Sequence, residues 1–332
     1  MQKPRVYLTR NIPKAIEILS KSCNLVIHKS ETLPSKKEVI KNIKDKDALL
    51  CSLSDIIDSE IISVAKKLKV ISSYSVGYDH IDIDAATKHG VFVTYTPEVL
   101  TETTADLAFA LMLAVARRIA EADALVRKGG WKQGWRYDFM FGRDVHGKIL
   151  GIIGLGRIGS AVAKRAKGFS MKILYHNRKR LSFENESKLL VEYRSLGDLL
   201  RESDFVSIHL PLSKDTWHLI NEEKLKLMKP TAYLINTARG AIIDEGALVK
   251  ALKNKWIAGA GLDVFEKEPI AKNSQLLRMN NVVLSPHIAS ASKETRERMA
   301  EVAARNLLNV LNGEKPIFAV NPQVLRQGDH FP

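Results

Sequence analysis

The sequence predicts an α/β protein with two doubly wound domains, each a parallel sheet covered by helices on both faces. Short apolar runs alternate with amphipathic helical stretches over residues 1–99, and a second alternating set begins at Lys148. This alternation is typical of parallel strands joined by crossover helices. A glycine-rich turn follows the first strand of the second set only, which distinguishes the two domains. A chain of 332 residues is long enough for both.

The first set contains five expected strands and three expected helices. The strands are Val6–Leu8, Leu25–Ile27, Ala48–Cys51, Lys69–Ile71 and Val91–Val93, and the helices lie near Lys14–Ser20, Lys36–Ile43 and Ile61–Lys67. Thr96-Pro97-Glu98 then interrupts the pattern, because proline restricts its predecessor to extended geometry. We therefore expect the first segment of this domain to end at residue 99.

A long helix is expected over Leu100–Lys128, with Gly129-Gly130 ending it. Its apolar residues spread nearly all round between Leu107 and Ala116, a run too short for a membrane span of about 20 residues. Such a helix is buried between domains or against a second subunit, so we expect a homodimer. The aromatic, basic segment Trp131–Tyr137 is expected as a loop that either anchors itself or reaches over a substrate pocket.

The second set contains six expected parallel strands. They are Ile149–Ile153, Lys172–Tyr175, Phe205–Ile208, Ala232–Asn236, Gly259–Asp263 and Val282–Leu284, with helices near Ser160–Lys167, Leu196–Arg201, Glu222–Met228 and Glu245–Lys253. Because this set is complete by His287, the last helix, about Lys293–Leu311, is expected to return to the first domain. The expected boundaries are 1–99 plus 289–332 for the smaller domain and 100–288 for the larger.

Composition excludes several classes of partner. The net charge is +14, yet the basic residues are scattered in pairs such as Lys36-Lys37 and are not clustered with aromatic residues, so no nucleic-acid surface is expected. Cys23 and Cys51 have no metal-like spacing, which predicts neither a metal site nor a disulfide framework. With no signal-peptide pattern at the N-terminus, we expect a cytoplasmic protein that binds no membrane.

The glycine turn Gly154-Leu155-Gly156-Arg157-Ile158-Gly159 lies between the apolar run Ile149–Ile153 and a helical stretch. A strand, a glycine turn and a helix in succession describe a dinucleotide site far better than the glycines alone. The first glycine makes the tight turn, the second lets the backbone approach a pyrophosphate, and the third allows close packing of helix on strand. The larger domain is therefore expected to be a Rossmann NAD(P)-binding domain.

The end of the second strand of that domain indicates which dinucleotide is preferred. NAD sites carry an acidic residue here, about 20 positions beyond the glycines. Asn177 occupies that position, and Arg178, Lys179 and Arg180 follow it. A guanidinium can bind a 2′-phosphate that a carboxylate would repel, so NADPH is expected in preference to NADH. The alternative is a solvated basic turn.

Three segments at strand ends carry candidate catalytic groups. Arg239 lies in Asn236-Thr237-Ala238-Arg239-Gly240, Glu268 follows the Gly259–Asp263 strand, and His287 follows Val282–Leu284. Each residue alone is ordinary. Ligands of open α/β sheets bind at the carboxyl ends of the strands, so all three can meet in one crevice.

At these residues the chain resembles the D-2-hydroxyacid dehydrogenase family over essentially its whole length, and most closely the glyoxylate/hydroxypyruvate reductase branch with its archaeal members. The motifs are Val76-Gly77-Tyr78-Asp79-His80-Ile81-Asp82, Thr103-Thr104-Ala105-Asp106-Leu107-Ala108, the glycine turn, Thr237-Ala238-Arg239-Gly240, Gly261-Leu262-Asp263-Val264-Phe265 and Pro286-His287-Ile288. The resemblance implies a smaller, flavodoxin-like substrate-binding domain beside the Rossmann domain.

The resemblance also implies a catalytic set of Arg239, Glu268 and His287. Arg239 would hold the carboxylate and oxo oxygen of a 2-oxo acid. His287 would donate a proton to the carbonyl oxygen as hydride arrives from the nicotinamide, and Glu268 would orient the imidazole and keep it protonated. Glyoxylate and hydroxypyruvate would thus become glycolate and D-glycerate.

Further contacts follow from the same resemblance. Substrate would meet Leu53, Val76 and Gly77, besides Arg239 and His287. The dinucleotide would meet Thr104, Leu210, Pro211, Thr237, Ala238, Asp263 and Ala289, besides the glycine turn, Arg239 and His287. Two departures, Ala289 for a frequent glycine and His80 for a frequent asparagine, affect fine substrate preference.

Competing functions remain open at this stage. A 3-phosphoglycerate dehydrogenase often carries regulatory domains that are absent here, and a formate dehydrogenase has glutamine in place of Glu268. A dinucleotide-sensing interaction protein could share the fold, but the complete catalytic set argues for an enzyme.

Overall fold

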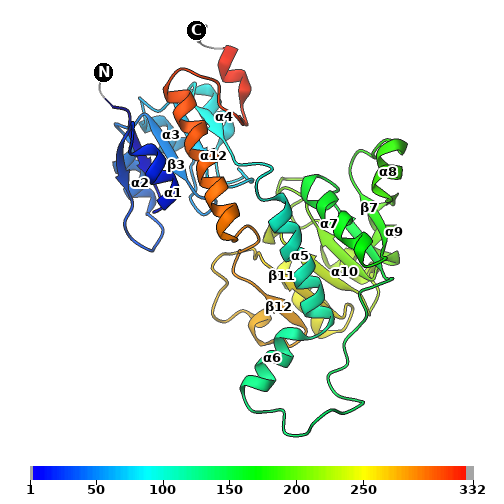
Figure 1. Cartoon of the computed structure of the whole chain (residues 1–332). Coiled ribbons are helices and arrows are strands. Elements are labelled where there is room, and N and C mark those ends of the chain that lie inside the picture. The colour runs from blue at the N-terminus through cyan, green and yellow to red at the C-terminus, as the bar shows by residue number, and fades with distance from the viewer. Residues whose placement is uncertain (1–2, 327–332) are drawn as a thin grey trace. The chain divides into compact units, whose positions relative to one another are not determined.

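The computed structural model describes residues 3–326 and contains two compact units. The first comprises the chain up to Leu100 together with the chain from Ala291 onward, and the second is Thr101–Ser290. Both are parallel sheets flanked by helices, so the predicted fold class is confirmed (Figure 1). Among the described residues, no helix has the length and apolar character needed to cross a membrane.

The sheet of the first unit has five parallel strands in the order β2-β1-β3-β4-β5. The strands are β1 (Arg5–Leu8), β2 (Asn24–Ile27), β3 (Ala48–Cys51), β4 (Val70–Ser73) and β5 (Phe92–Thr94). The helices between them are α1 (Pro13–Leu19), α2 (Lys36–Ile43), α3 (Ser59–Val64) and α4 (Ile83–Lys88). This strand order is the flavodoxin-like one.

Polar side chains cap the N-termini of α2, α3 and α4. Ser35 and Glu38 form a reciprocal capping box at α2, and Asp58 accepts a hydrogen bond from the Ile61 amide at α3. Asp82 caps α4 in the same way through Ala85. The sequence did not predict α4, because its six residues contain one large apolar side chain, Ile83, and therefore show no helical hydrophobic period.

The C-terminal part of the chain completes the first unit. Helix α12 (Lys293–Leu311) packs on β3, β4 and β5 and runs beside α1 (Figure 1). The hydroxyl of Ser72 on β4 donates to the carbonyl of Ala303 on α12 at 2.9 Å. Asn321, fully buried, then accepts from the Val93 amide and donates to the Val91 carbonyl, so the last described segment is fastened to β5. The short 3-10 helix η3 (Pro322–Arg326) follows it.

The sheet of the second unit has seven parallel strands in the order β12-β11-β10-β9-β6-β7-β8, one more than predicted. They are β6 (Ile149–Ile153), β7 (Lys172–His176), β8 (Glu192–Tyr193), β9 (Phe205–Ile208), β10 (Tyr233–Asn236), β11 (Gly259–Leu262) and β12 (Val282–Leu284). The added edge strand β8 has only two residues and no apolar run. The helices are α7 (Arg157–Gly168), α8 (Phe183–Leu189), α9 (Leu196–Glu202), α10 (Glu222–Leu227) and α11 (Glu245–Lys253), with 3-10 turns η1 (Gly240–Ile242) and η2 (Gln275–Arg278).

The predicted single helix over Leu100–Lys128 is wrong, since two helices replace it. Helix α5 (Thr101–Ala116) ends where the Ala116 carbonyl accepts from the Arg143 amide at 2.8 Å, and α6 (Ile119–Arg127) begins after Arg118. Arg118 has left-handed backbone (φ 55°), and its guanidinium is held by Glu121. Helix α6 therefore does not continue along the axis of α5.

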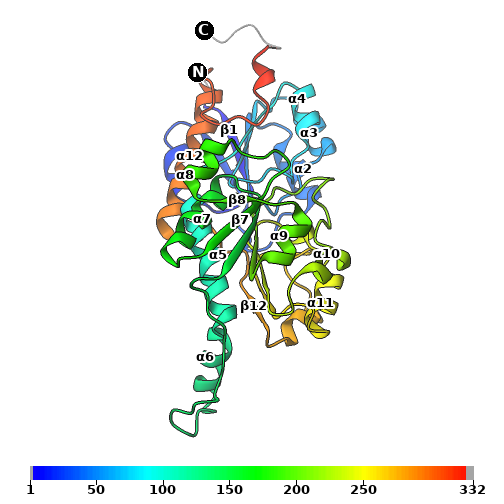
Figure 2. The same cartoon turned by 90° about the vertical axis from the view of Figure 1, so that its right-hand side faces the viewer.

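The two helices also differ in burial. Helix α5 packs on α7, β10, β11 and β12 of its own unit, and Ala105, Ala108, Met112 and Ala116 are fully buried there. Much of its apolar surface is thus buried within its own unit, while Leu107, Leu113 and Ala114 are partly exposed. Helix α6 has no buried residue and projects with the following loop as an arm (Figure 2).

Candidate functional site

Each glycine of the turn after β6 is required for a different physical reason. Gly154 has φ 96°, and a Cβ there would lie 2.7 Å from the carbonyl oxygen of His209. A Cβ on Gly159 would lie 2.3 Å from the Gly154 carbonyl oxygen, so this position joins α7 tightly to the turn. Gly156 is exposed, with nothing within 4 Å of a Cβ. It precedes Arg157 and Ile158 and caps α7 without a side chain, so the backbone is accessible at this helix N-terminus.

Asn177 connects the turn to the end of β7. Its Oδ1 accepts a hydrogen bond from the Leu155 amide at 2.7 Å, 22 residues earlier in the chain. The Gly154 amide donates to the His176 carbonyl at 2.9 Å, which holds the same two segments together. The residue at the expected ribose-binding position therefore also fixes the shape of the phosphate-binding turn.

The three cations after Asn177 have different environments. Arg178 pairs with Asp215 at 3.1 Å, while Lys179 is exposed. Arg180 donates to both carboxylate oxygens of Glu186 at 2.7 and 2.8 Å. Glu186 also accepts from the Tyr175 hydroxyl at 2.6 Å, and these two partners lower the pKa of Glu186 to about 2. Arg180 is thus neutralised locally, which leaves Arg178 as the better candidate for a phosphate.

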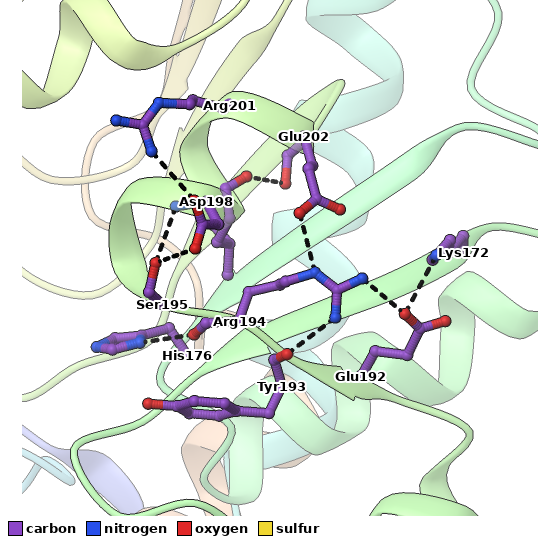
Figure 3. Close-up of polar contacts among 11 residues, drawn as sticks. Lys172, His176, Glu192, Tyr193, Arg194, Ser195, Asp198, Arg201 and Glu202 are labelled. Carbon is purple, nitrogen blue, oxygen red and sulfur yellow. Dashed lines mark hydrogen bonds and ion pairs between the residues drawn. The ribbon is translucent and has the colours of Figure 1, made fainter.

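A polar network holds β8 against β7 beside these cations (Figure 3). The guanidinium of Arg194 donates to Glu192 and Glu202, both at 2.9 Å, and Lys172 pairs with Glu192 at 3.1 Å. His176 Nδ1 lies 3.0 Å from the Arg194 carbonyl oxygen. The short edge strand is therefore fixed by ion pairs, since only two residue pairs join it to β7.

Asn236 shapes the turn that presents Arg239. Its side chain accepts from the Ala238 amide at 3.0 Å and donates to the Arg239 carbonyl at 2.9 Å. The Arg239 guanidinium donates to the Ala238 carbonyl at 2.9 Å, and its charge contributes to lowering the pKa of Glu268. A buried amide at the end of β10 thus sets the backbone of the arginine-bearing turn.

Gly240 brings the arginine turn against the segment that carries Glu268. A Cβ at Gly240 would lie 1.9 Å from the carbonyl carbon of Phe265 and 2.1 Å from its oxygen. The Phe265 amide in turn donates to Glu268 Oε1 at 3.1 Å. Direct backbone contact therefore fixes the spacing between the two catalytic candidates, and no side chain fits between them.

Glu268 and His287 are directly hydrogen-bonded. His287 Nδ1 lies 2.7 Å from Glu268 Oε2, and the two side chains are 23% and 32% exposed, so solvent and a ligand can reach them. Burial raises the pKa of the Glu268 carboxyl. The hydrogen bond and the charge of His287 outweigh this effect, so the pKa lies below its usual range. Bonding at Nδ1 leaves Nε2 as the ring nitrogen for proton transfer.

Asp263 holds the loop that carries His287. Its Oδ1 accepts from the Ser285 hydroxyl at 2.6 Å and the Ile288 amide at 2.9 Å, and its Oδ2 accepts from the Ala289 amide at 2.8 Å. Burial raises the pKa of Asp263, against these hydrogen bonds. The loop places His287 in left-handed backbone (φ 54°), a costly conformation for a residue with a side chain. Asp263, a predicted dinucleotide contact, therefore also has a structural role.

The remaining predicted residues lie in both units. In the second, Thr104 is buried on α5, Leu210 and Pro211 follow β9, and Leu210 Cδ2 would lie 2.8 Å from a Cβ on Gly154. In the first, Leu53 follows β3 while Val76 and Gly77 follow β4, so these three share one edge of that sheet. Ser75 donates to the Gly77 carbonyl, and His80 Nε2 lies 3.3 Å from Ser73 Oγ.

The residues at the carboxyl edge of the second sheet fit a dinucleotide. The Oγ1 atom of Thr237 is buried without a hydrogen-bond partner within the described chain, so it is available to a ligand. Gly156 leaves open space at the N-terminus of α7, a helix of 12 residues that no side chain caps. An approaching pyrophosphate requires such a space. Both features lie on the same edge as Arg239 and His287.

Three supporting residues escaped the sequence interpretation in these roles. Asn236 and Asp263 belong to the motifs quoted, but only the fold shows that their side chains hold the loops of Arg239 and His287. Asp215 gave no signal, because its contact with Arg178 spans 37 residues.

Comparison with known proteins identifies related chains. Residues 109–289 match the family model described as D-isomer specific 2-hydroxyacid dehydrogenase, NAD binding domain. The glyoxylate reductase of Thermofilum pendens is 54% identical over 98% of this chain and 97% of its own length, and that of Korarchaeum cryptofilum is 55% identical over 98% of each. An NADPH-dependent glyoxylate/hydroxypyruvate reductase from Sinorhizobium meliloti, solved with NADP and malonate, superposes with a TM-score of 0.85 at 32% identity, covering 96% of this chain and 97% of that one.

We expect Gly240→Ala to lower the free energy of unfolding by about 1–3 kcal/mol, because the added methyl group overlaps the Phe265 carbonyl. Chemical denaturation of the purified protein measures the change. Gly168→Ala is the control, since a Cβ there meets nothing within 4 Å. Equal stability of the two variants would contradict the close contact.

Proposed function

Because the chain belongs to the D-isomer specific 2-hydroxyacid dehydrogenase family, in its glyoxylate reductase branch, we propose that it reduces glyoxylate and hydroxypyruvate to glycolate and D-glycerate with NADPH. The chain is an NAD(P)-dependent oxidoreductase by this membership. The observation that carries the proposal is the hydrogen-bonded Glu268–His287 pair beside Arg239, at the sheet edge where ligands of this fold bind. The test is reduction of a panel of 2-oxo acids, with NADPH and NADH compared.

His287 serves as the proton donor in this proposal. Glu268 stabilises the doubly protonated ring through Nδ1, so the Nε2 proton is available to a carbonyl oxygen. A bound nicotinamide supplies the hydride for the carbonyl carbon. Arg239 binds the substrate carboxylate with its planar fork and polarises the oxo oxygen. In the reverse direction the neutral imidazole accepts the hydroxyl proton.

The remaining site residues complete the proposal. The glycine turn and Thr237 bind the dinucleotide, and the family resemblance implies that Leu53, Val76 and Gly77 contact the substrate. Arg178 binds the 2′-phosphate of NADPH, with Lys179 contributing charge. Cys23 and Cys51 are buried and unpaired thiols, which suits a reducing cytoplasm.

Replacing His287 by Ala should lower turnover by about 10²–10⁴-fold, because a positioned proton donor contributes that much. Dinucleotide binding should change little, since the glycine turn is untouched. Arg239→Lys should also be impaired, because an ammonium cannot reproduce the fork. Steady-state rates with glyoxylate and binding titrations separate these effects. Near-parental turnover of His287→Ala would remove it as the acid.

The pH dependence tests Glu268 separately. In Glu268→Gln the protonated ring loses its anionic partner, so reduction should fall off at lower pH than in the parent. Oxidation of the hydroxy acid needs the neutral ring and should extend to lower pH. Rate profiles in both directions measure this. A reduction profile that moves upward in pH would exclude Glu268 as the stabilising carboxylate.

Cofactor preference should move from NADPH toward NADH in the double variant Asn177→Asp, Arg178→Ala. The introduced carboxylate could keep the hydrogen bond from Leu155 with one oxygen and offer the other to a ribose hydroxyl, while repelling a 2′-phosphate. Loss of charge-assisted bonds predicts a shift of about 10–100-fold in the ratio of kcat/KM values. A parent that uses NADH equally well would contradict the preference.

We infer a homodimer whose interface includes the arm formed by α6 and the loop 131–141. Ile119 and Val126 are each 55% exposed on α6, and Trp131, Trp135 and Tyr137 are 56%, 86% and 80% exposed in the loop. Grouped exposed apolar side chains are typical of protein interfaces. This surface replaces the buried helix α5 as the basis for expecting a dimer.

The mass in solution tests this interface. Light scattering at micromolar concentration should give a dimer for the parent, and the double variant Ile119→Glu, Val126→Glu should be monomeric, because both charges would be buried on assembly. Phe183→Glu, at a position 83% exposed on α8, should remain dimeric. A monomeric parent would reject the interface.

A further inference from the structure

The ion pair between Arg178 and Asp215 crosses the mouth of the glycine turn. Arg178 follows β7 and Asp215 lies in the loop after β9, while β6, which leads into the turn, lies between these strands. Ile153 of β6 pairs in register with His176 of β7 and with Ile208 of β9. The three strand ends are therefore level, and the contact between Arg178 Nη1 and Asp215 Oδ2, at 3.1 Å, joins the two loops that flank the turn.

Asp215 supplies a negative charge near the position after β7 where NAD sites carry an acidic residue and this chain has none. Position 177 is an asparagine, so no carboxylate from β7 reaches a ribose or repels a 2′-phosphate. The carboxylate of Asp215 comes from the neighbouring loop and meets the one arginine of this segment that no buried acid neutralises. Arg180 is committed to Glu186, whose side chain is only 8% exposed.

The pair is suited to exchange. The side chains of Arg178 and Asp215 are 88% and 71% exposed, and an ion pair in that much water is weak. A 2′-phosphate carries more charge than a carboxylate and offers three acceptor oxygens, so it can displace Asp215 from the guanidinium. The displaced carboxylate stays on a flanking loop, where its charge opposes the phosphate.

We propose that Asp215 is a specificity-determining residue that competes with the 2′-phosphate of NADPH for Arg178. It holds the guanidinium at the turn when no phosphate is bound, and it reduces the advantage of NADPH over NADH. This inference rests on the proposed use of Arg178 for the 2′-phosphate. In NAD sites an acid at the end of the strand equivalent to β7 accepts a hydrogen bond from the ribose 2′-hydroxyl. In this chain the acid lies in the loop after β9, where it limits phosphate binding.

Binding of two fragments to the full-length protein tests the proposal. Adenosine 2′,5′-bisphosphate carries the phosphate, and 5′-AMP lacks it. Asp215→Asn should tighten the bisphosphate by about three- to tenfold and leave 5′-AMP within about twofold, because only the phosphate competes with the carboxylate. The KM for NADPH should fall correspondingly with kcat unchanged, and added salt should reduce the gain.

Matched variants separate the possible causes. Glu192→Gln removes the same charge from the pairs that Glu192 forms with Lys172 and Arg194, and should not change either affinity (Figure 3). Arg178→Met should weaken the bisphosphate at least tenfold and leave 5′-AMP unchanged. In that background Asp215→Asn should lose most of its effect.

The two hypotheses fail in different ways. If Arg178→Met binds the bisphosphate as the parent does, the assignment of Arg178 in the proposed function is wrong. If Arg178→Met weakens binding but Asp215→Asn has no effect or also weakens it, Asp215 merely positions the arginine and the inference of competition is overturned. Tightening by Asp215→Asn that persists fully in Arg178→Met also overturns it, because the two side chains would then act independently.

Discussion

The hydrogen bonds of the buried Asp263 carboxylate are the constraint on which the position of His287 depends. One carboxylate at the end of β11 holds the hydroxyl of Ser285 and two backbone amides of the following loop. The loop can therefore keep His287 in a backbone conformation that a non-glycine residue seldom adopts. Without that support, the ring would have no fixed direction from which to meet Glu268.

A second constraint acts from the neighbouring strand. The absence of a side chain at Gly240 lets the arginine turn touch the backbone of Phe265, and Phe265 in turn binds Glu268. Three strand ends, β10, β11 and β12, are thus joined through their loops by backbone contacts and two buried polar side chains. Each of these loops is therefore held in place by contacts with the next one.

Much of this arrangement could be predicted from local sequence, because strands with apolar runs and a glycine turn between strand and helix are local signals. The fold class followed from them. The edge strand β8 could not be predicted, since ion pairs to Arg194 fix its two residues. The break at Arg118 depends on Arg143, 25 residues later in the chain, which satisfies the end of α5. The environments of Arg178 and Arg180 differ through their partners Asp215 and Glu186, and side-chain pairing of that kind is a property of the folded chain.

The return of the chain to its first unit has a consequence for synthesis on the ribosome. Unit two, Thr101–Ser290, is contiguous and has all its strands once residue 290 has emerged. The first unit is begun earlier yet finished later, because α12 and Asn321 supply cover for β3, β4 and β5. Its sheet must wait with one apolar face uncovered while nearly 200 further residues are translated, and such a face is where a nascent chain aggregates or is held by a chaperone. The order of domains along the gene is thus not the order in which they mature.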